Sequence, residues 1–389
     1  MINRLIILGN GFDLSHKLKT KYSDFIENYY SQIKDSSWKD DFLEFLIPGY
    51  LFNNMNSLKE IMNYMSSRLG EFSIMHPEKN LHINRKPAIL LHNHFFYEIS
   101  RKIESNWVDI EIEYFHNLLK ILDQPSTNSI YDDIKKLNQE IDLIAKKFED
   151  YLIDNVNPEI SSKYNDKTAH LFEDRLIPDS ESIEEFLKEF PESYAKTIRT
   201  DLMKKWKDNN NWSKFDETLI LNFNYTNTAE ELYSDKLKNY KTINIHGSLD
   251  DIENPINLGF GDEMHKRYSD IEEKNENEYL RLMKSFAYTN TDNYRELFNF
   301  IEDKVFQVHI MGHSCGISDR TLLNAIFENK NCKSIKVFYH NYDKKNTNSQ
   351  SDNYSEIVRN ISRHFNQKTL MRNKIVNKSL STELPQLKL

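Results

Sequence analysis

Two patterns of apolar residues divide the chain. Short apolar or alternating runs, which indicate buried strands, fall near both ends, at residues 5–8, 218–225, 242–246, 307–311 and 334–339. Between residues 26 and 212, apolar residues recur mainly at three- and four-residue steps, most clearly over residues 130–152, which indicates amphipathic helices. Strands that alternate with helices are typical of a parallel sheet, so both ends of the chain are predicted to contribute to one.

These patterns predict an α/β fold with a Rossmann-like parallel sheet and a large, mainly helical insertion. Residues 1–25 and 215–345 are expected to form the sheet domain, and residues 26–214 the insertion. Residues 346–389 are expected to form a C-terminal helix and a basic, solvated tail, because the lysines and arginines after residue 366 lie on no strong apolar face.

Glycine is scarce and is concentrated after apolar runs. Seven of the nine glycines follow the runs 5–8, 243–245, 256–258 and 308–311, namely Gly9, Gly11, Gly247, Gly259, Gly261, Gly312 and Gly316. Glycine therefore marks predicted strand ends. Open α/β sheets bind ligands at the carboxyl ends of their strands, so these turns are expected to surround any binding site.

The first glycine turn has the pattern of a phosphate-binding turn. Gly9, Asn10, Gly11, Phe12 and Asp13 join an apolar run to a helical pattern. Glycines let the backbone turn sharply and approach a ligand, and free amides at a helix N-terminus attract anions. A nucleotide phosphate is one interpretation of this turn. A tight turn without a ligand explains the same residues equally well.

Polar residues follow the other predicted strands as well. Side chains that can bind or react occur at the ends of successive runs, namely Asn222, Asn224, His246, His313, Ser314 and Asn341. With Asn10 and Asp13, they are expected to converge on one crevice, because the carboxyl ends of parallel strands meet at one edge of a sheet. Within a strand, the side chains of Asn222 and Asn224 would point to the same side.

Composition narrows the classes of function. A net charge of −9 argues against a broad nucleic-acid or anionic-membrane surface, which needs an excess of lysine and arginine. Cys315 and Cys332 are the only cysteines, too few for a disulfide framework and without metal-binding spacing. No apolar stretch approaches the roughly 20 residues of a membrane span. We therefore expect a soluble, cytoplasmic protein without a metal.

Three segments of the chain carry a family resemblance. The glycine turn at residues 9–13 with the segment 19–25, the segment from Trp107 to Glu111, and residues 312–319 resemble motifs of the bacterial phage-defence family AbiH, the abortive infection proteins. The resemblance covers nearly the whole chain. It implies a role in phage defence, with a phage-derived trigger and a second copy of the chain as candidate partners.

A more distant resemblance implies chemistry. Residues 222–226 (Asn-Phe-Asn-Tyr-Thr), His246 with Gly247, and residues 312–314 are similar, in the same order, to sirtuin-like motifs. Sirtuin-like proteins bind NAD in a Rossmann-type domain, and defence members hydrolyse it. The resemblance implies that Asn224 orients a ribose or a water molecule and that His246 acts as the base. Asp13, Asp109 or Glu111 would stabilise positive charge nearby.

The same resemblance implies a set of NAD-contacting residues. The glycine turn would approach the pyrophosphate, and polar groups at the later strand ends would hold the rest of the nucleotide. The implied contacts are Gly9, Asn10, Gly11, Phe12, Asn222, Gly247, Gly312, His313, Ser314 and Asn341.

Two other classes of function remain open from the sequence. A nucleotide-binding sensor without turnover is favoured by Thr226, which stands where the sirtuin-like motif has Asp, and by Asp13 in the glycine loop. A nuclease effector is favoured only by the basic tail and by the tripeptide His92-Asn93-His94, which has the letters of a nuclease motif. The site residues also have structural interpretations, because His246 can be a hydrogen-bonded strand-end histidine and Asn224 a helix cap.

Overall fold

The computed structural model describes residues 2–388 except 47–51, 53–54, 70–72, 76–87, 104–108, 125–129, 177–178, 210–212 and 343–350. Its centre is a six-stranded sheet in which every neighbouring pair is parallel. The strands are β1 (Asn3–Leu8), β5 (Thr218–Asn222), β6 (Tyr240–Asn244), β7 (Phe306–Met311), β8 (Cys332–Tyr339) and β9 (Thr382–Glu383). The predicted α/β fold with a parallel sheet is confirmed.

The strand order places the first strand at the centre of this sheet. The order is β6-β5-β1-β7-β8-β9, so β5 and β6 extend the sheet on one side of β1, and β7, β8 and β9 extend it on the other. All six residues of β1 are buried. Such a strand needs apolar side chains on both faces, which explains why it reads as an unbroken apolar run. Along the chain, β1, β5 and β6 are added toward one edge of the sheet, and β7, β8 and β9 toward the other. The strand order therefore reverses between β1 and β7.

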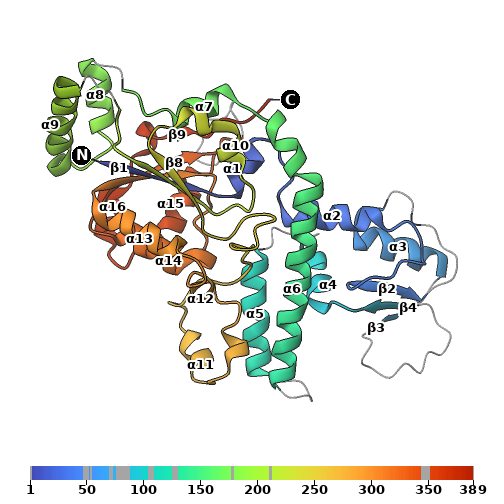
Figure 1. The fold of residues 1–389 in the computed structure, drawn as a ribbon. Helices are drawn as coiled ribbons and strands as arrows, with labels where there is room; N and C mark the ends of the chain where they lie inside the picture. The colour runs from blue at the N-terminus through green and yellow to red at the C-terminus, as the bar shows by residue number, and fades with distance from the viewer. Residues whose placement is uncertain are drawn as a thin grey trace.

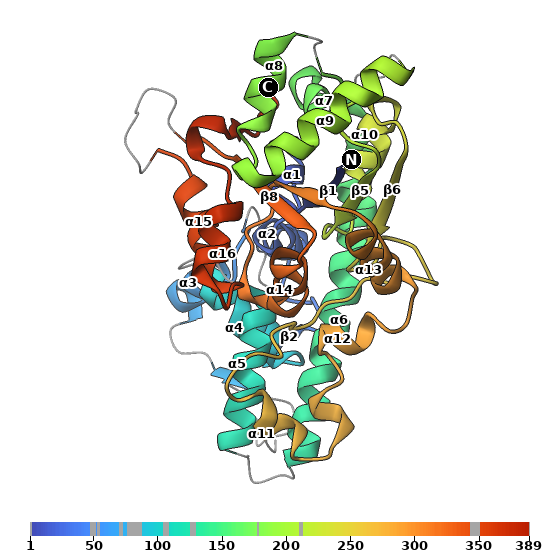
Figure 2. The same cartoon turned by 90° about the vertical axis from the view of Figure 1, so that its left-hand side faces the viewer.

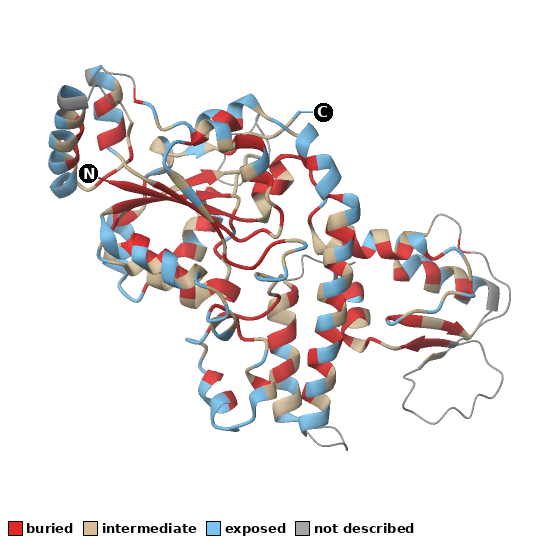
Figure 3. Cartoon of the chain, in the orientation of Figure 1, coloured by how far each residue is buried: buried red, intermediate tan, exposed pale blue. Residues whose placement is uncertain are grey.

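Helices cover both faces of the sheet. On one face, Leu5 and Ile7 pack in a core with α13 (Asn293–Asp303), α14 (Arg320–Glu328) and α15 (Tyr354–Arg363) (Figures 1 and 2). On the other face, Ile6 and Leu8 belong to a second core, which continues into the insertion. Figure 3 shows the buried residues running from the sheet into the helices α5 (Ile110–Asp123) and α6 (Ile130–Asn155).

The insertion is mainly helical, as expected. The helix predicted over residues 130–152 is α6, which lies beside α5 (Figure 1). The remaining helices of this region are α2 (Tyr22–Gln32), α3 (Leu58–Leu69), α4 (His94–Ile103), η1 (Asn157–Ser162), α7 (Asp166–Phe172), α8 (Ser180–Leu187) and α9 (Glu192–Asn209). The helices α8 and α9 form a small core of their own, which includes Ile2 before β1 and Phe215 before β5.

The insertion also contains a small sheet that the sequence analysis did not foresee. Its strands are β2 (Leu43–Leu46), β3 (Ser73–Met75) and β4 (Ala88–Leu91). The central strand β4 pairs antiparallel with β2 and parallel with β3. The sequence analysis identified no strand in this region, because runs of three or four residues are too short to show a period of two.

A long connection joins β6 to β7. It contains α11 (Tyr268–Glu272), η3 (Asn277–Tyr279) and α12 (Lys284–Ala287) before α13. Residues 256–258 precede two glycines but form no strand; nearby, Phe260 makes one isolated bridge to Met283. The other short elements are α1 (Asn10–Ser15), α10 (Thr228–Tyr233), η2 (Ser234–Lys236) and η4 (Ile317–Asp319).

The C-terminal residues are packed, so the prediction of a solvated tail was wrong. After α15 the chain forms α16 (Lys368–Lys374), η5 (Lys378–Leu380) and the edge strand β9. Lys374 is buried, and its ammonium donates hydrogen bonds to the carbonyls of Phe327 (2.8 Å) and Asn329 (2.9 Å) at the end of α14. A cation at a helix C-terminus is favourable, so this lysine has a structural partner. No described helix is long and apolar enough to span a membrane.

Candidate functional site

The glycine turns after β1 and β7 pack directly against each other. The Gly11 amide donates to the Gly312 carbonyl (2.8 Å). Gly312 has φ +76°, and a Cβ there would lie 2.0 Å from the Phe12 nitrogen. A Cβ on Gly9 would lie 2.6 Å from the Cα of His313. For the first glycine turn, the sequence analysis left open whether the glycines approach a ligand or form only a tight turn. In this structure they allow the two turns to approach each other between β1 and β7, where the strand order reverses.

The asparagines after β5 fix their own turn and reach the first glycine turn. The Asn224 amide nitrogen donates to the Gly9 carbonyl (3.2 Å), and its backbone amide donates to the Asn222 Oδ1 (3.1 Å). The Asn222 side chain donates to the Thr226 carbonyl (2.9 Å). The strand ends at Asn222, so the argument that placed both side chains on one side of a continuing strand was wrong. Asn224 nevertheless lies at the paired glycine turns.

The two departures from the sirtuin-like motif contact each other. The Thr226 hydroxyl donates to the Asp13 Oδ2 (2.6 Å), and the Thr228 hydroxyl donates to the Thr226 oxygen (3.2 Å). Asp13 is buried. Burial raises the pKa of Asp13 to about 6, although hydrogen bonds from Thr226, Thr228 and Asn224 oppose this shift. Asp13 thus connects the turn after β1 to the turn after β5.

Phe12 and Ser314 lie in different surroundings. Phe12 is fully buried, and its ring contacts those of Phe172 and Tyr233 in the core. A nucleotide contact of Phe12 would therefore have to come from its backbone. Ser314 is exposed, and its carbonyl accepts a hydrogen bond from the side chain of Asn360 (2.8 Å).

Asn10, Asn341 and Gly247 also have protein partners. Asn10 accepts a hydrogen bond from Thr20 in the first turn. Asn341 follows β8 and donates to the Glu383 Oε1 in β9 (2.8 Å). Gly247 has φ +86°, and a Cβ there would lie 2.1 Å from the carbonyl oxygen of Pro255. These residues lie at the carboxyl edge of the sheet, and their contact with a nucleotide stays a prediction.

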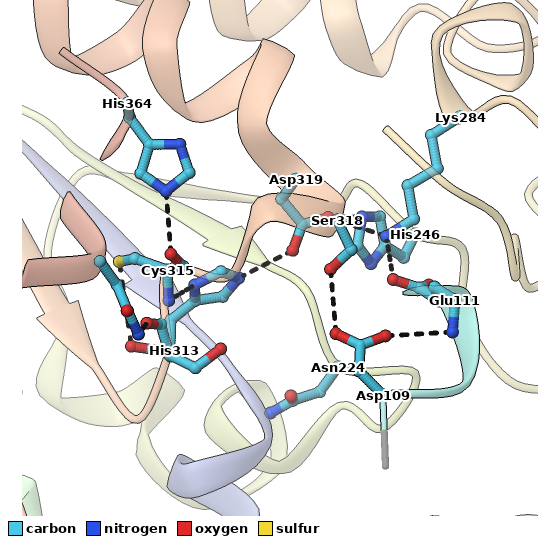
Figure 4. A network of polar contacts seen from close by, with 12 residues as sticks. Asp109, Glu111, Asn224, His246, Lys284, His313, Cys315, Ser318, Asp319 and His364 are labelled. Carbon is cyan, nitrogen blue, oxygen red and sulfur yellow. Dashed lines mark hydrogen bonds and ion pairs between the residues drawn. The ribbon is translucent and has the colours of Figure 1, made fainter. Parts of the chain in front are cut away.

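The two strand-end histidines converge on one carboxylate. His246 Nε2 lies 3.2 Å from Asp319 Oδ1, and His313 Nε2 lies 3.5 Å from Asp319 Oδ2 (Figure 4). The ring of Phe223 contacts both imidazoles edge-on, with centroid distances of 4.9 and 4.3 Å. All four side chains are buried. The sequence analysis placed His246 and His313 in one crevice, and the structure brings them together through Asp319.

A buried lysine joins this carboxylate to the insertion. Lys284, the first residue of α12, is fully buried, and its Nζ lies 2.8 Å from Asp319 Oδ1 and 2.7 Å from Glu111 Oε2 (Figure 4). Glu111 belongs to α5. The cluster of Glu111, Lys284, Asp319, His246 and His313 is called the Lys284 cluster below.

Burial and pairing set the charges within the Lys284 cluster. Burial acts to raise the pKa of Asp319, but Lys284 and His246 outweigh it and hold that pKa well below its usual value. Burial acts to lower the pKa of Lys284, but Asp319 and Glu111 raise it well above the usual value. Burial, reinforced by Lys284, lowers the pKa of His246 to about 4. At neutral pH, Asp319 and Lys284 are therefore charged and His246 is neutral.

The backbone after β7 fixes the orientation of His313. Cys315 has φ +53°, and its amide donates to His313 Nδ1 (2.9 Å). His364 Nε2 in turn donates to the Cys315 carbonyl (2.9 Å). Because Nδ1 of His313 accepts a hydrogen bond, the proton of the neutral ring lies on Nε2, which faces Asp319.

The insertion meets the sheet edge at the N-terminus of α5. Asp109 caps this helix by accepting hydrogen bonds from the amides of Glu111 (3.0 Å) and Ile112 (3.1 Å). Its second oxygen accepts from the hydroxyl of Ser318 (3.4 Å), in the turn after β7 (Figure 4). Burial raises the pKa of Asp109. Trp107 and Val108, in the same motif, lie outside the described residues.

The tripeptide with nuclease letters begins a helix. Asn93 is buried; its side chain donates to the Glu140 carbonyl (2.8 Å) and accepts from the Phe96 amide (2.7 Å) at the start of α4. His92 lies 3.2 Å from Glu44, and His94 lies 3.3 Å from Glu98. Within the described residues, no group of three or more His, Cys, Asp and Glu side chains is arranged to hold a metal ion.

Sequence reasoning missed the role of Lys284 and did not single out Asp319. Lys284 lies in a stretch that reads as helical, and its nearest glycine in the sequence is Gly261. No local pattern distinguishes it from a surface lysine. Asp319 offered a signal, since it ends the segment 312–319 that carries the resemblance, seven residues after Gly312.

The fold and the cluster define an α/β protein with a charged, buried polar site at the carboxyl edge of a parallel sheet. Comparison with protein families shows that the chain belongs to the family described as bacteriophage abortive infection AbiH, whose model matches residues 5–342. The comparison with curated proteins gave no match. The resemblance to AbiH seen in the sequence is thus confirmed, and abortive infection is the function that membership of the family implies.

Proposed function

We propose that this AbiH protein acts in abortive infection by binding NAD or a related nucleotide and hydrolysing its nicotinamide–ribose bond. One observation carries the proposal: three strand ends bring polar side chains to the paired glycine turns. Asn224 and His313 each contact the turn at Gly9, and His246 shares Asp319 with His313. This place lies between β1 and β7, where the sheet reverses direction. Open α/β sheets bind their ligands at such a point.

The strand order supports a dinucleotide as the ligand. If only the six strands of this sheet are numbered in chain order, their order is 3-2-1-4-5-6. Doubly wound sheets with this order bind dinucleotides across the crevice at the reversal point. We therefore include in this proposal that the sheet domain is a Rossmann-like, sirtuin-like nucleotide-binding domain, as the sequence suggested.

The reaction requires positioning more than strong acid catalysis. The bond between the ribose C1′ and the nicotinamide nitrogen breaks, and its electron pair neutralises the positive ring, so nicotinamide leaves without being protonated. The transition state resembles an oxocarbenium ion, and water then adds to C1′. Asn224 would orient the ribose or the water. His246, neutral at pH 7, would face the reacting carbon.

The site is closed in this structure. The exposed fractions of the side chains are 6% for His246, 9% for Asp319 and 12% for Glu111. The Gly9 carbonyl, which would lie beside a pyrophosphate, accepts a hydrogen bond from the side-chain amide of Asn224. Binding of a dinucleotide therefore requires that the insertion open at the sheet edge and close again over the ligand. A phage-derived trigger would act at this step.

An assay of NAD with protein purified from phage-infected cells tests the proposal. We expect nicotinamide and ADP-ribose in equal amounts by chromatography and mass spectrometry. His246→Ala should form neither product, while its thermal unfolding temperature stays near that of the wild type. The matched control is His170→Ala, which removes a histidine whose side chain is 71% exposed and should not change turnover. Equal turnover by His246→Ala and the wild type would exclude a role for His246.

A sensor that binds a nucleotide without turnover is the second candidate. It is favoured by the hydrogen bond between Thr226 and Asp13. Both residues depart from the sirtuin-like motif, and each is the other's hydrogen-bond partner. Calorimetry with ADP-ribose separates the two candidates from a protein that binds no nucleotide. Binding of NAD without product formation, in protein prepared from infected cells, would identify the sensor.

A further inference from the structure

His246 and Glu111 are two groups in the Lys284 cluster that can accept a proton, and their surroundings differ. His246 Nε2 lies between Asp319 Oδ1 (3.2 Å) and the Tyr288 hydroxyl (3.4 Å). Its ring stacks on Tyr288 and meets the edge of Phe223. This packing keeps the imidazole neutral and makes it a weak base at neutral pH, with a pKa of about 4.

Glu111 lies at the outer end of the same cluster. Its side chain is 12% exposed, whereas Lys284, to which it is bonded, is fully buried. Several charged and titratable groups face Glu111. They are Lys284 from α12, Tyr288 at the end of α12, Asp319 from η4, Asp109 at the start of α5, Tyr22 from α2 and Tyr225 from the turn after β5. Glu111 therefore lies where the insertion and the sheet edge meet.

Charge balance makes Glu111 the residue whose protonation can change. One ammonium serves two carboxylates, and Asp319 also has both histidines as partners. Asp319 therefore keeps its charge. Glu111 shares the same lysine with Asp319. Burial raises the pKa of Glu111 to about 8, and the nearby carboxylates of Asp319 and Asp109 add to the rise, even though Lys284 opposes it.

We infer that Glu111, which the insertion brings to the sheet edge, carries the exchangeable proton of this site and accepts the proton of the attacking water. Lys284 and Asp319 are positioning residues that hold Glu111 and the histidines in place. The inference rests on the proposed hydrolysis of NAD and assigns its proton acceptor.

The step is balanced in atoms and charge. The water oxygen bonds to the ribose C1′ as the bond from C1′ to the nicotinamide nitrogen breaks. The electron pair of that bond stays on nicotinamide. The water proton moves to the Glu111 carboxylate, which afterwards releases it to solvent. A positively charged nicotinamide ring nearby favours the carboxylate form of Glu111 before the reaction.

The pH profile tests this role, and its sign follows from the carboxylate being the active form. We expect kcat/KM to rise about tenfold per pH unit below the pKa of Glu111 and to level off above it, near pH 8. Glu111→Gln should no longer show this limb, the rise of kcat/KM with pH. Its turnover should fall on the order of 10²-fold or more. Binding of ADP-ribose, measured by calorimetry, should persist. The matched control is Glu113→Gln on the same helix, whose partner is Lys102 and which should keep both.

Asp319→Asn tests the positioning role through the same limb. Lys284 then faces one carboxylate instead of two, so the pKa of Glu111 should fall and the limb should move to lower pH. A merely structural role of Asp319 would reduce turnover at every pH and leave the limb in place, which would overturn this part of the inference.

Infrared difference spectroscopy of the full chain tests the proton directly, without turnover. The wild type minus Glu111→Gln spectrum should contain the carbonyl band of a protonated carboxyl group at pH 7, and this band should disappear near pH 8. Its absence overturns the inference whether or not NAD is hydrolysed. A wild type that is purified from phage-infected cells and leaves NAD intact overturns the proposed function. Hydrolysis by Glu111→Gln with the wild-type pH profile overturns only the role of Glu111.

Discussion

At the scale of single residues, Lys284 joins the insertion to the sheet edge by an ion pair in a buried setting. Its ammonium is fully buried and bonded to two carboxylates that would otherwise repel each other. Breaking such a pair by removing one partner is costly, because the remaining charges have lost their hydration without keeping a counter-charge. The lysine should therefore matter for stability as well as for the site.

Lys284→Met should lower the free energy of unfolding by about 3–5 kcal/mol, measured by urea denaturation at pH 7. The control is Arg281→Met, whose pair with Asp142 is 40% and 46% exposed and should be worth about 0–1 kcal/mol. Adding Asp319→Asn to Lys284→Met should restore part of the loss, because Asp319 is the carboxylate that keeps its charge at pH 7 and this substitution removes that unpaired charge. Equal effects of the two single substitutions would contradict this description of the cluster.

Part of the site could be predicted from the sequence at this scale. His246 and His313 could be predicted to meet because each follows a strand of one parallel sheet, and the structure places both on Asp319. Lys284 could not, because its position depends on how the long connection between β6 and β7 folds across the edge. The glycines were found, but the close packing of Gly11 on Gly312 could not be distinguished from contact with a ligand.

At the scale of elements, α5 attaches the insertion to the core. Its first turn reaches Ser318 through Asp109, and further along the helix Phe115 stacks on Phe260 with a centroid distance of 4.0 Å and an angle of 12° between the rings. Both phenylalanines are buried. Stacked, buried rings contribute through area removed from water and through their contact. The docking of α5 therefore has a polar part at the site and an apolar part beyond it.

Phe115→Ala should lower the free energy of unfolding by about 3–5 kcal/mol, because it leaves a cavity against Phe260. The matched control is Phe286→Ala, since Phe286 is 46% exposed and a surface substitution is expected to change stability by about 0.5 kcal/mol or less. Guanidinium denaturation of both variants measures the difference. If Phe115→Ala were as stable as Phe286→Ala, the insertion would not depend on this contact.

The elements that could be predicted are those with a long enough pattern. The strands β1 and β5 are buried at every position and contain the apolar runs 5–8 and 219–221, and the 26 residues of α6 repeat their apolar positions many times. The strands β2, β3, β4 and β9 have two to four residues each. Such short segments become strands through their neighbours rather than through their own sequence.

At the scale of the whole molecule, the site is assembled from parts that lie far apart in the chain. The turn after β1, the turn after β5, the connection after β6 and the turn after β7 contribute from the sheet domain, and α5 contributes from the insertion (Figures 1 and 4). The parallel sheet and the convergence of its strand ends could be expected from the sequence. The approach of α5 to the strand ends depends on the fold of the insertion, which no local pattern specifies.

The central claim is that this assembled site consumes NAD during infection. The most direct measurement is mass-spectrometric quantification of NAD, nicotinamide and ADP-ribose in phage-infected cells that carry the wild type or Asn224→Ala, a change at the residue that bonds to the Gly9 carbonyl. We predict that NAD falls while nicotinamide and ADP-ribose rise in wild-type cells, and that Asn224→Ala abolishes this change at equal protein levels. Undiminished NAD in wild-type cells that are protected from phage would contradict the account.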